Sequence, residues 1–123
     1  MIRSALAMIC FLLLLSAPTT VAADGNEYLS RCNNVIRSMD DKSDTVDHGK
    51  IMSCLGFVQA FTQATIIFTN MGYELPVCLP TDGIVNSQAV RIFVGFMEDN
   101  PELLHLEEMF LLIAAFMTAF PCD

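Results

Sequence analysis

The chain is poor in positively charged side chains and in residues that commonly carry out catalysis. Of its 123 residues, six are Lys or Arg and two are His, against fourteen Asp or Glu, and the formal net charge is −8. Nucleic acids and anionic lipids repel such a surface, so we expect no nucleic-acid partner. The acidity favours solubility and attraction to basic partners.

The sequence also lacks the short motifs that carry catalysis or bind cofactors. It has no glycine-rich phosphate loop, no Gly-x-Ser-x-Gly turn and no Cys-x-x-Cys-His haem attachment. A calcium-binding loop of the EF-hand type that starts at Asp40 is excluded. Thr45 occupies the position of its glycine, and Ile51 occupies that of its glutamate. Glu107 and Glu108 are adjacent, so on a helix they point apart. We therefore expect a binding protein that is not an enzyme and has no cofactor.

Two arrangements of chemically active residues stay open as alternatives. Asp44, Asp47 and His48 could ligate a metal from one helical turn, although capping is the commoner role of such aspartates. Cys54 and His48 could form a nucleophilic pair, although a structural cysteine is the commoner case in an apolar helix. We expect neither a metal site nor a catalytic site.

The first 23 residues have the pattern of a secretory signal peptide. Arg3 precedes an apolar stretch over residues 5–15, and small residues ending at Ala23 offer a cleavage site before Asp24. The apolar stretch is too short for a membrane anchor. We expect residues 1–23 to be removed and residues 24–123 to form one exported domain.

Export changes how the cysteines are interpreted, because disulfides persist in oxidising compartments. Four cysteines follow residue 23, and four allow three pairings. Cys32 and Cys54 are equally far from residue 43, and Cys78 and Cys122 are equally far from residue 100. In an antiparallel helix hairpin, two residues equally far from the turn lie opposite each other. If the chain turns at residues 43 and 100, the two cysteines of each pair would therefore be neighbours. We therefore predict the disulfides Cys32–Cys54 and Cys78–Cys122.

Apolar periodicity predicts helices in the first half of the domain. In residues 26–39, apolar side chains recur at three- and four-residue spacing, which predicts a helix with one apolar face. A second helix, over residues 45–70, has a cap near Asp44 and ends before Gly72, which is typical of a helix stop. Its middle is apolar nearly all round, so we expect it to be the buried central helix.

Two further helices are predicted in the second half. Thr81 or Asp82 caps a helix whose apolar face extends from residue 84 to residue 97. Asn100 as N-cap, with Pro101 in the first turn, starts a helix that continues to about residue 120. The predicted fold is all-α, a small bundle of about four helices in two antiparallel hairpins with two disulfides.

Residues 109–117 form a continuous apolar run. The run is about half the length needed to span a bilayer, so we expect no stable membrane insertion of the exported chain. A buried core helix is the simplest interpretation. The alternative is that one flank of this helix seals a homodimer.

Several short motifs follow one another along residues 52–122. They are Cys54-Leu-Gly-Phe57, Cys78-Leu-Pro80, Gln88, Pro101-Glu102, His105 and Phe120-Pro121-Cys122. Together they resemble the immunity proteins of type VI secretion amidase effectors, the Tai/Rap family. Phe57 departs from the family pattern, which usually has Tyr there, so a hydroxyl is missing. The resemblance marks six positions as structural motif residues: Gly56, Phe57, Pro80, Gln88, His105 and Pro121.

The resemblance implies a small all-α periplasmic protein that is usually dimeric. It would bind and block its cognate effector, a peptidoglycan amidase with a Cys/His active site. Occluding the active-site groove needs a rigid projection and no chemistry from the inhibitor.

The candidate projection is the acidic turn Glu98-Asp99-Asn100-Pro101-Glu102, which a following helix would hold in place. The alternative for this turn is an ordinary solvated loop. The alternative function is a periplasmic helical stress or holdase-type protein that binds clients through apolar surface. Such proteins typically expose that surface on acidification, when many carboxylates become protonated.

Overall fold

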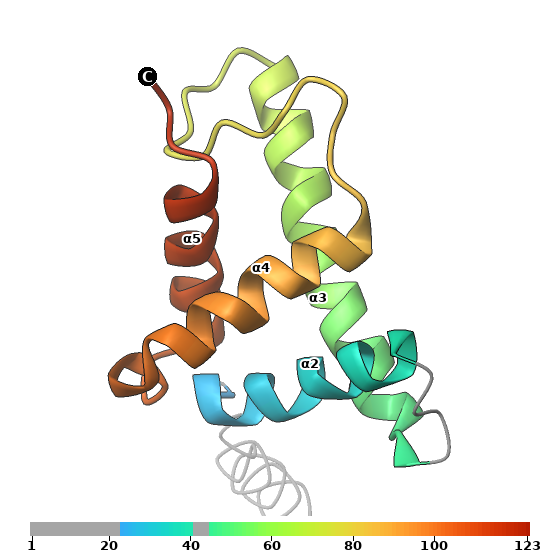
Figure 1. Cartoon of the computed structure of the whole chain (residues 1–123). Helices are drawn as coiled ribbons and strands as arrows, with labels where there is room; N and C mark the ends of the chain where they lie inside the picture. The colour runs from blue at the N-terminus through green and yellow to red at the C-terminus, as the bar shows by residue number, and fades with distance from the viewer. Residues whose placement is uncertain (1–22, 41–44) are drawn as a thin grey trace, which may run out of the picture.

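The computed structural model describes residues 23–40 and 45–123. Within these ranges the chain forms four α-helices and one short 3₁₀ helix, and its only strand-like pairing is a single bridge between Asp24 and Glu107. The elements are α2 (Gly25–Met39), α3 (His48–Asn70), α4 (Asn86–Asp99), η2 (Pro101–Leu103) and α5 (Glu108–Ala119). The all-α class and the four helices predicted from the sequence are confirmed, but the two antiparallel hairpins are not formed, because α2 lies across α3 and α4 runs obliquely to α5 (Figure 1).

The helices are arranged around α4 (Figure 1). α3 and α5 run upright on either side, α4 crosses obliquely between them, and α2 lies across their lower ends. α4 packs against all three other α-helices. Its buried face consists of Ala89, Val90, Phe93, Val94 and Met97. The central helix is therefore α4, and the prediction that residues 45–70 form the buried central helix is wrong.

α3 buries one face only. Cys54, Val58, Thr62 and Thr65 recur at three- and four-residue spacing and face the core. By length and composition α3 is apolar enough to cross a membrane, a test that core helices of soluble proteins also pass. Only 22% of its most apolar 18-residue window is buried inside the protomer. The other faces of α3 therefore leave apolar surface uncovered.

Two aspartates set the starts of α2 and α3. A side-chain oxygen of Asp24 accepts a hydrogen bond from the Glu27 N–H at 3.1 Å, and one of Asp47 accepts from the Lys50 N–H at 3.1 Å. An N-cap carboxylate satisfies a free backbone donor and interacts favourably with the helix dipole. Asp44, the cap expected from the sequence, lies outside the described residues, and α3 begins at residue 48 rather than at residue 45.

The predicted stop of α3 at Gly72 is confirmed. Gly72 has a φ of 87°, a left-handed conformation that glycine adopts at little cost. Its N–H donates to the carbonyl oxygen of Thr69 at 3.0 Å, and the Tyr73 N–H donates to that of Phe68 at 3.0 Å. These bonds satisfy carbonyl groups of the last turn, which ends the helix.

The third predicted helix begins later than expected. Thr81 and Asp82, predicted as its caps, lie in a turn closed by a hydrogen bond from the Gly83 N–H to the Pro80 carbonyl oxygen at 2.8 Å. Gly83 has a φ of 73°, which is incompatible with a helix interior. α4 begins after Val85, which makes no side-chain cap hydrogen bond.

The single helix predicted over residues 100–120 is wrong, because the structure divides it into η2 and α5. The start of α2 docks in the gap between them. The Gly25 N–H donates to the Leu106 carbonyl oxygen at 3.0 Å, and the Asn26 N–H donates to that of Leu104 at 3.2 Å. A continuous helix would use these carbonyl groups internally. The contact with α2 therefore overrides the local helix pattern.

Both predicted disulfides are present. Cys32 on α2 pairs with Cys54 on α3, with their Cα atoms 5.2 Å apart, and Cys78 pairs with Cys122 at 5.1 Å. The second disulfide does not connect two helices, because Cys78 lies in the loop before α4 and Cys122 follows α5. It fastens the 71–85 loop to the last residues of the chain.

Candidate functional site

Residues 98–102, the partner-binding element predicted from the sequence, lie where α4 ends and η2 begins. Asn100 holds this junction, because its backbone N–H (3.1 Å) and its side-chain amide (2.8 Å) both donate to the Phe96 carbonyl oxygen. Pro101 takes the first position of η2, where its fixed φ suits a helical turn. We call this firmly held turn the acidic tip.

The acidic tip presents three exposed carboxylates, from Glu98, Asp99 and Glu102. Among the residues that the structure describes, none of the three makes an ion pair or a side-chain hydrogen bond. Nδ1 of His105 lies 2.9 Å from the Glu102 carbonyl oxygen, so this ring nitrogen has a local partner. The tip can therefore offer three carboxylates to a basic surface without breaking internal contacts.

Among the described residues, Lys and Arg occur only on α2, at the start of α3 and at one position on α4. Residues 51–123, all of which are described, contain eight Asp or Glu but a single Lys or Arg. That residue, Arg91, is paired with Asp40 at 3.1 Å. The other described cations lie on α2 and the first turn of α3, where Arg31 donates to Ser53 and Lys50 to Ser30. The opposite end, formed by residues 71–85 and 120–123, has no basic side chain.

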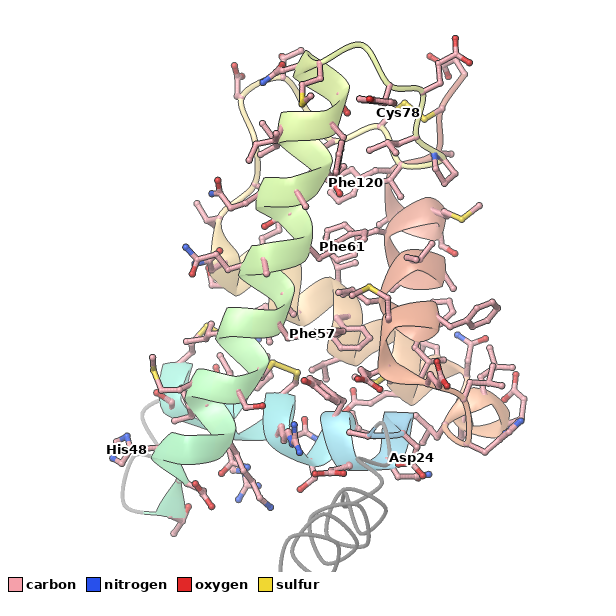
Figure 2. All side chains as sticks on the ribbon, turned by 180° about the vertical axis from the view of Figure 1, so that it is seen from behind. Asp24, His48, Phe57, Phe61, Cys78 and Phe120 are labelled. Carbon is pink, nitrogen blue, oxygen red and sulfur yellow. A yellow bond between two sulfur atoms is a disulfide. The ribbon has the colours of Figure 1, made fainter. Side chains whose placement is uncertain are left out.

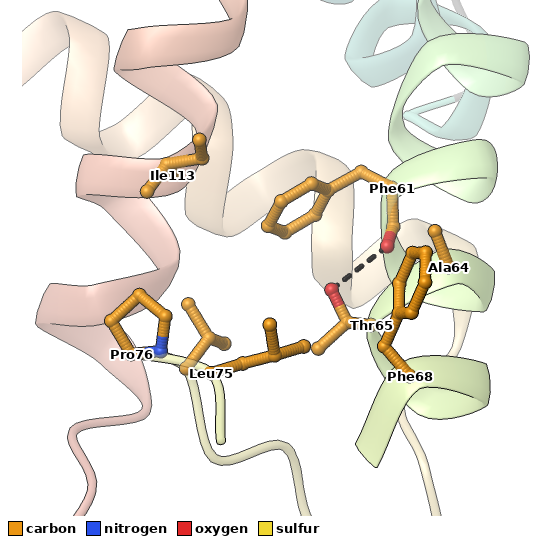
Figure 3. Close-up of a pocket in the computed structure, with 8 residues that line it drawn as sticks. Phe61, Ala64, Thr65, Phe68, Leu75, Pro76 and Ile113 are labelled. Atoms are coloured by element: carbon orange, nitrogen blue, oxygen red, sulfur yellow. Dashed lines mark hydrogen bonds between the residues drawn. The ribbon is translucent and has the colours of Figure 1, made fainter. Parts of the chain in front are cut away.

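An apolar cavity opens at this opposite end, between α3 and α5 (Figure 3). Its volume is about 250 Å³. Thr65 carries the only side-chain hydroxyl in the lining, and this group donates to the Phe61 carbonyl oxygen at 2.9 Å. The lining offers no free side-chain hydrogen-bonding group, so it suits an apolar ligand. The cavity is lined by Phe61, Ala64, Thr65, Phe68, Leu75, Pro76, Val77 and Ile113.

Aromatic rings fill the rest of the space between α3 and α5. Figure 2 shows Phe57 and Phe61 pointing from α3 toward α5. The Phe61 ring meets that of Phe116 edge-on at 5.2 Å, and Phe57 packs against Tyr28 at 4.6 Å. Phe57, the departure from the family motif, is thus a packing residue that is partly buried. A hydroxyl is not needed for these ring contacts.

The remaining motif residues lie mostly on the surface. Pro80 accepts the turn hydrogen bond that precedes α4, and Pro121 lies exposed beside Cys122. Gln88 is exposed in the first turn of α4. Gly56 is exposed on α3, and a Cβ added there would meet no atom within 4 Å. No contact inside the protomer therefore requires glycine at position 56.

The geometry excludes the nucleophilic pair considered from the sequence, because Cys54 is bonded to Cys32. Of the candidate metal ligands, Asp47 accepts a hydrogen bond as the cap of α3, and Asp44 lies outside the described residues. In the described ranges 23–40 and 45–123, no group of three or more His, Cys, Asp or Glu side chains is placed to hold a metal ion.

Sequence reasoning missed the apolar cavity. Its walls come from α3, from the loop at residues 75–77 and from Ile113 on α5, and no local pattern joins these segments. The only hint in the sequence was a pair of aromatic residues at the end of α3 and in the next loop, Phe68 and Tyr73, whose rings meet edge-on at 5.7 Å beside the cavity lining.

Comparison with known proteins gives one match. The family model of the Rap1a immunity proteins matches residues 24–122. The resemblance inferred from the motifs is thereby confirmed. No curated protein and no solved structure matches the chain.

Proposed function

The chain belongs to the Rap1a immunity protein family, and on that premise we propose that it binds and blocks a peptidoglycan amidase effector of the type VI secretion system in the periplasm. The observation that carries the proposal is the extent of the family match, which covers nearly all of the chain after the predicted signal peptide. The function is inhibition by binding, and it requires no catalytic group from this protein.

Periplasmic action is supported by the cysteines. Two disulfides join all four cysteines of residues 24–123. Such bonds form and persist in oxidising compartments. The signal-like residues 1–23 supply a route to that compartment, and peptidoglycan, the proposed target of the effector, lies there.

The acidic tip is our proposed inserted element. It is exposed, held by the two Asn100 hydrogen bonds, and it carries three unpaired carboxylates. A pre-organised turn loses little entropy on docking, and its charge would speed encounter with a basic active-site groove. Steric filling of that groove is sufficient to exclude peptidoglycan.

A homodimer is part of the proposal, and we assign its contact to the exposed face of α3. This face carries Met52 and Ile67, and Met71 directly follows the helix. The three side chains are between 54% and 68% exposed. Gly56 lies between them in sequence, exposed and with open space around its Cα. A second copy would bury this apolar surface, and the missing side chain would let the two helices approach closely.

The experiment is co-purification of the secreted protein with candidate peptidoglycan amidase effectors, followed by titration of tip variants against the amidase that binds. Replacing Glu98, Asp99 and Glu102 together by alanine should weaken binding at least tenfold. The triple amide variant E98Q/D99N/E102Q is the matched control, because it removes charge and keeps shape. Unchanged affinity of the alanine variant would discard the acidic tip as the inserted element.

The exposed apolar surface also favours the second candidate, a holdase-type protein that binds unfolded clients. This function predicts that an apolar dye binds increasingly as the pH falls, with no tight cognate partner. Capture of one amidase at nanomolar concentration, without dye binding near neutral pH, would decide for the immunity function.

A further inference from the structure

The apolar cavity between α3 and α5 has the size of a pocket for one side chain. An engineered protein cavity of about 150 Å³ holds a benzene molecule, and this cavity measures about 250 Å³. Sites for drug-sized ligands and cofactors range from about 300 to 1,000 Å³. The cavity is therefore suited to one aromatic or branched aliphatic side chain rather than to a cofactor.

The walls of the cavity are held in place by covalent and hydrogen bonds. The Cys78–Cys122 disulfide ties the loop that carries Leu75 and Pro76 to the residues after α5. The Cys78 N–H also donates to the Phe120 carbonyl oxygen at 3.0 Å. Since the loop is fastened at this point, a ligand would enter a preformed pocket at small entropic cost.

Two exposed acidic residues are next in sequence to residues that form or fasten the cavity wall. Glu74 precedes the lining residue Leu75, and Asp123 follows Cys122, whose sulfur lies 3.4 Å from the Leu75 carbonyl oxygen. Both acidic side chains belong to exposed residues. No Lys or Arg occurs in residues 71–85 or 120–123. A ligand that enters beside these carboxylates is favoured if it carries positive charge.

We propose that this cavity is an anchor site for the effector, which inserts one apolar side chain and places a neighbouring Lys or Arg against Glu74 and Asp123. The assignment rests on the proposed immunity function and adds a second contact at the end of α5 opposite the acidic tip. Buried apolar anchors in preformed pockets typically supply much of the binding free energy of an interface, whereas exposed ion pairs at its rim mainly orient the partner.

The first test uses defined tripeptides and does not need the effector. N-acetyl-Lys-Phe-Lys-amide is titrated into the isotopically labelled secreted chain, and backbone amide shifts are recorded by NMR. We expect shifts at residues 61–68, 75–77 and 113. Binding should be about fivefold weaker for Glu-Phe-Glu and undetectable for Lys-Ala-Lys. Equal binding of all three peptides, or shifts spread over other surfaces, would overturn the anchor site.

The second test uses the amidase and two variants. Ala64→Trp fills the cavity from its lining, and Glu74→Lys reverses one rim charge. Asp82→Lys is the matched control for charge, because Asp82 is exposed in the same loop but neither lines the cavity nor adjoins a lining residue. We expect inhibition to weaken at least tenfold in A64W and about threefold in E74K, with no change in D82K. Thermal unfolding of each variant verifies that it is folded.

The outcomes separate the anchor site from the immunity function. If the wild type inhibits the amidase and folded A64W and E74K inhibit equally well, the anchor site is wrong and the immunity function stands. If the wild type inhibits no amidase, the proposed function fails, and the tripeptide titration still decides whether the cavity binds an apolar side chain beside a cation. Should Ala64→Trp not fold, the comparison of E74K with D82K decides the second test.

Discussion

Cys78 and Cys122 are both exposed, whereas Cys32 and Cys54 are fully buried, so the two disulfides of this protein differ in their access to solvent. The buried bond joins α2 to α3 inside the core. The exposed bond fastens the 71–85 loop, which forms part of the cavity wall. One disulfide therefore secures the core, and the other secures the proposed binding end.

Mild reduction under native conditions should open Cys78–Cys122 first, because a thiolate must reach a sulfur atom to attack it. Mass spectrometry after alkylation should find two modified cysteines, at positions 78 and 122, before any modification at positions 32 and 54. Simultaneous labelling of all four cysteines in the folded protein would contradict this order.

Removal of the exposed disulfide should also reduce stability. The bond closes a loop with a sequence separation of 44 residues, for which the chain-entropy model gives roughly 4 kcal/mol. Since small domains are stable by about 5–15 kcal/mol, the C78S/C122S variant should unfold at much lower denaturant concentration. A denaturation midpoint equal to that of the wild type would show that the Cys78–Cys122 disulfide does not contribute to the free energy of unfolding.

Gly25→Ala should be strongly destabilising. An added Cβ would lie 2.4 Å from Cδ1 of Leu111 and 2.9 Å from the Leu104 carbonyl oxygen. Overpacking of this kind costs about 1–3 kcal/mol, and here it would also strain the hydrogen bond from the Gly25 N–H to Leu106. Chemical denaturation measures the loss. A variant as stable as the wild type would mean that α2 does not dock against residues 104–111 as the structure describes.

Gly56→Ala tests the proposed homodimer contact on α3. Alanine is favoured over glycine in a helix by up to about 1 kcal/mol, and a Cβ at position 56 meets no atom of the protomer. We expect a more stable protomer but a weaker dimer, measured by sedimentation at several concentrations. Gly95→Ala on α4 is the control, because it also meets no atom within 4 Å. It should leave association unchanged, and equal association of G56A and wild type would reject this contact.

Asp47→Ala should shorten α3 at its start. The side chain of Asp47 caps the Lys50 N–H, and loss of such a cap costs about 0.5–2 kcal/mol. Asp47→Asn should retain most of that stability, because the amide oxygen accepts the same hydrogen bond. Amide hydrogen exchange at residues 48–51 is the readout. Faster exchange in D47A than in D47N supports the cap, and identical exchange in the two variants excludes it.

The elements that were predicted well are those fixed by local chemistry. α2 and the C-terminal end of α3 follow from apolar spacing and from Gly72, whose positive φ suits the end of a helix. The disulfide pairing was also predicted correctly. The reasoning from level helices describes Cys32–Cys54 better than the second pair, because Cys78 lies in a loop rather than on a helix.

The elements that were predicted wrongly depend on contacts between distant segments. Asn100 and Pro101 carry a local helix-start signal, yet only a three-residue 3₁₀ helix forms there. The helix cannot continue, because the carbonyl groups of Leu104 and Leu106 accept hydrogen bonds from the start of α2, about 80 residues earlier in the chain. The cavity between α3 and α5 was unpredictable for the same reason. The acidic tip, by contrast, is formed by five consecutive residues, so the sequence alone locates the turn, and its role in binding stays a prediction.

Inhibition is tested most directly by measuring peptidoglycan cleavage by the cognate amidase effector at increasing concentrations of the secreted protein. We expect cleavage to fall to background near one equivalent of this protein, and the two proteins then to elute as one complex in size-exclusion chromatography. Undiminished cleavage in the presence of excess protein, with the two proteins eluting separately, would contradict it.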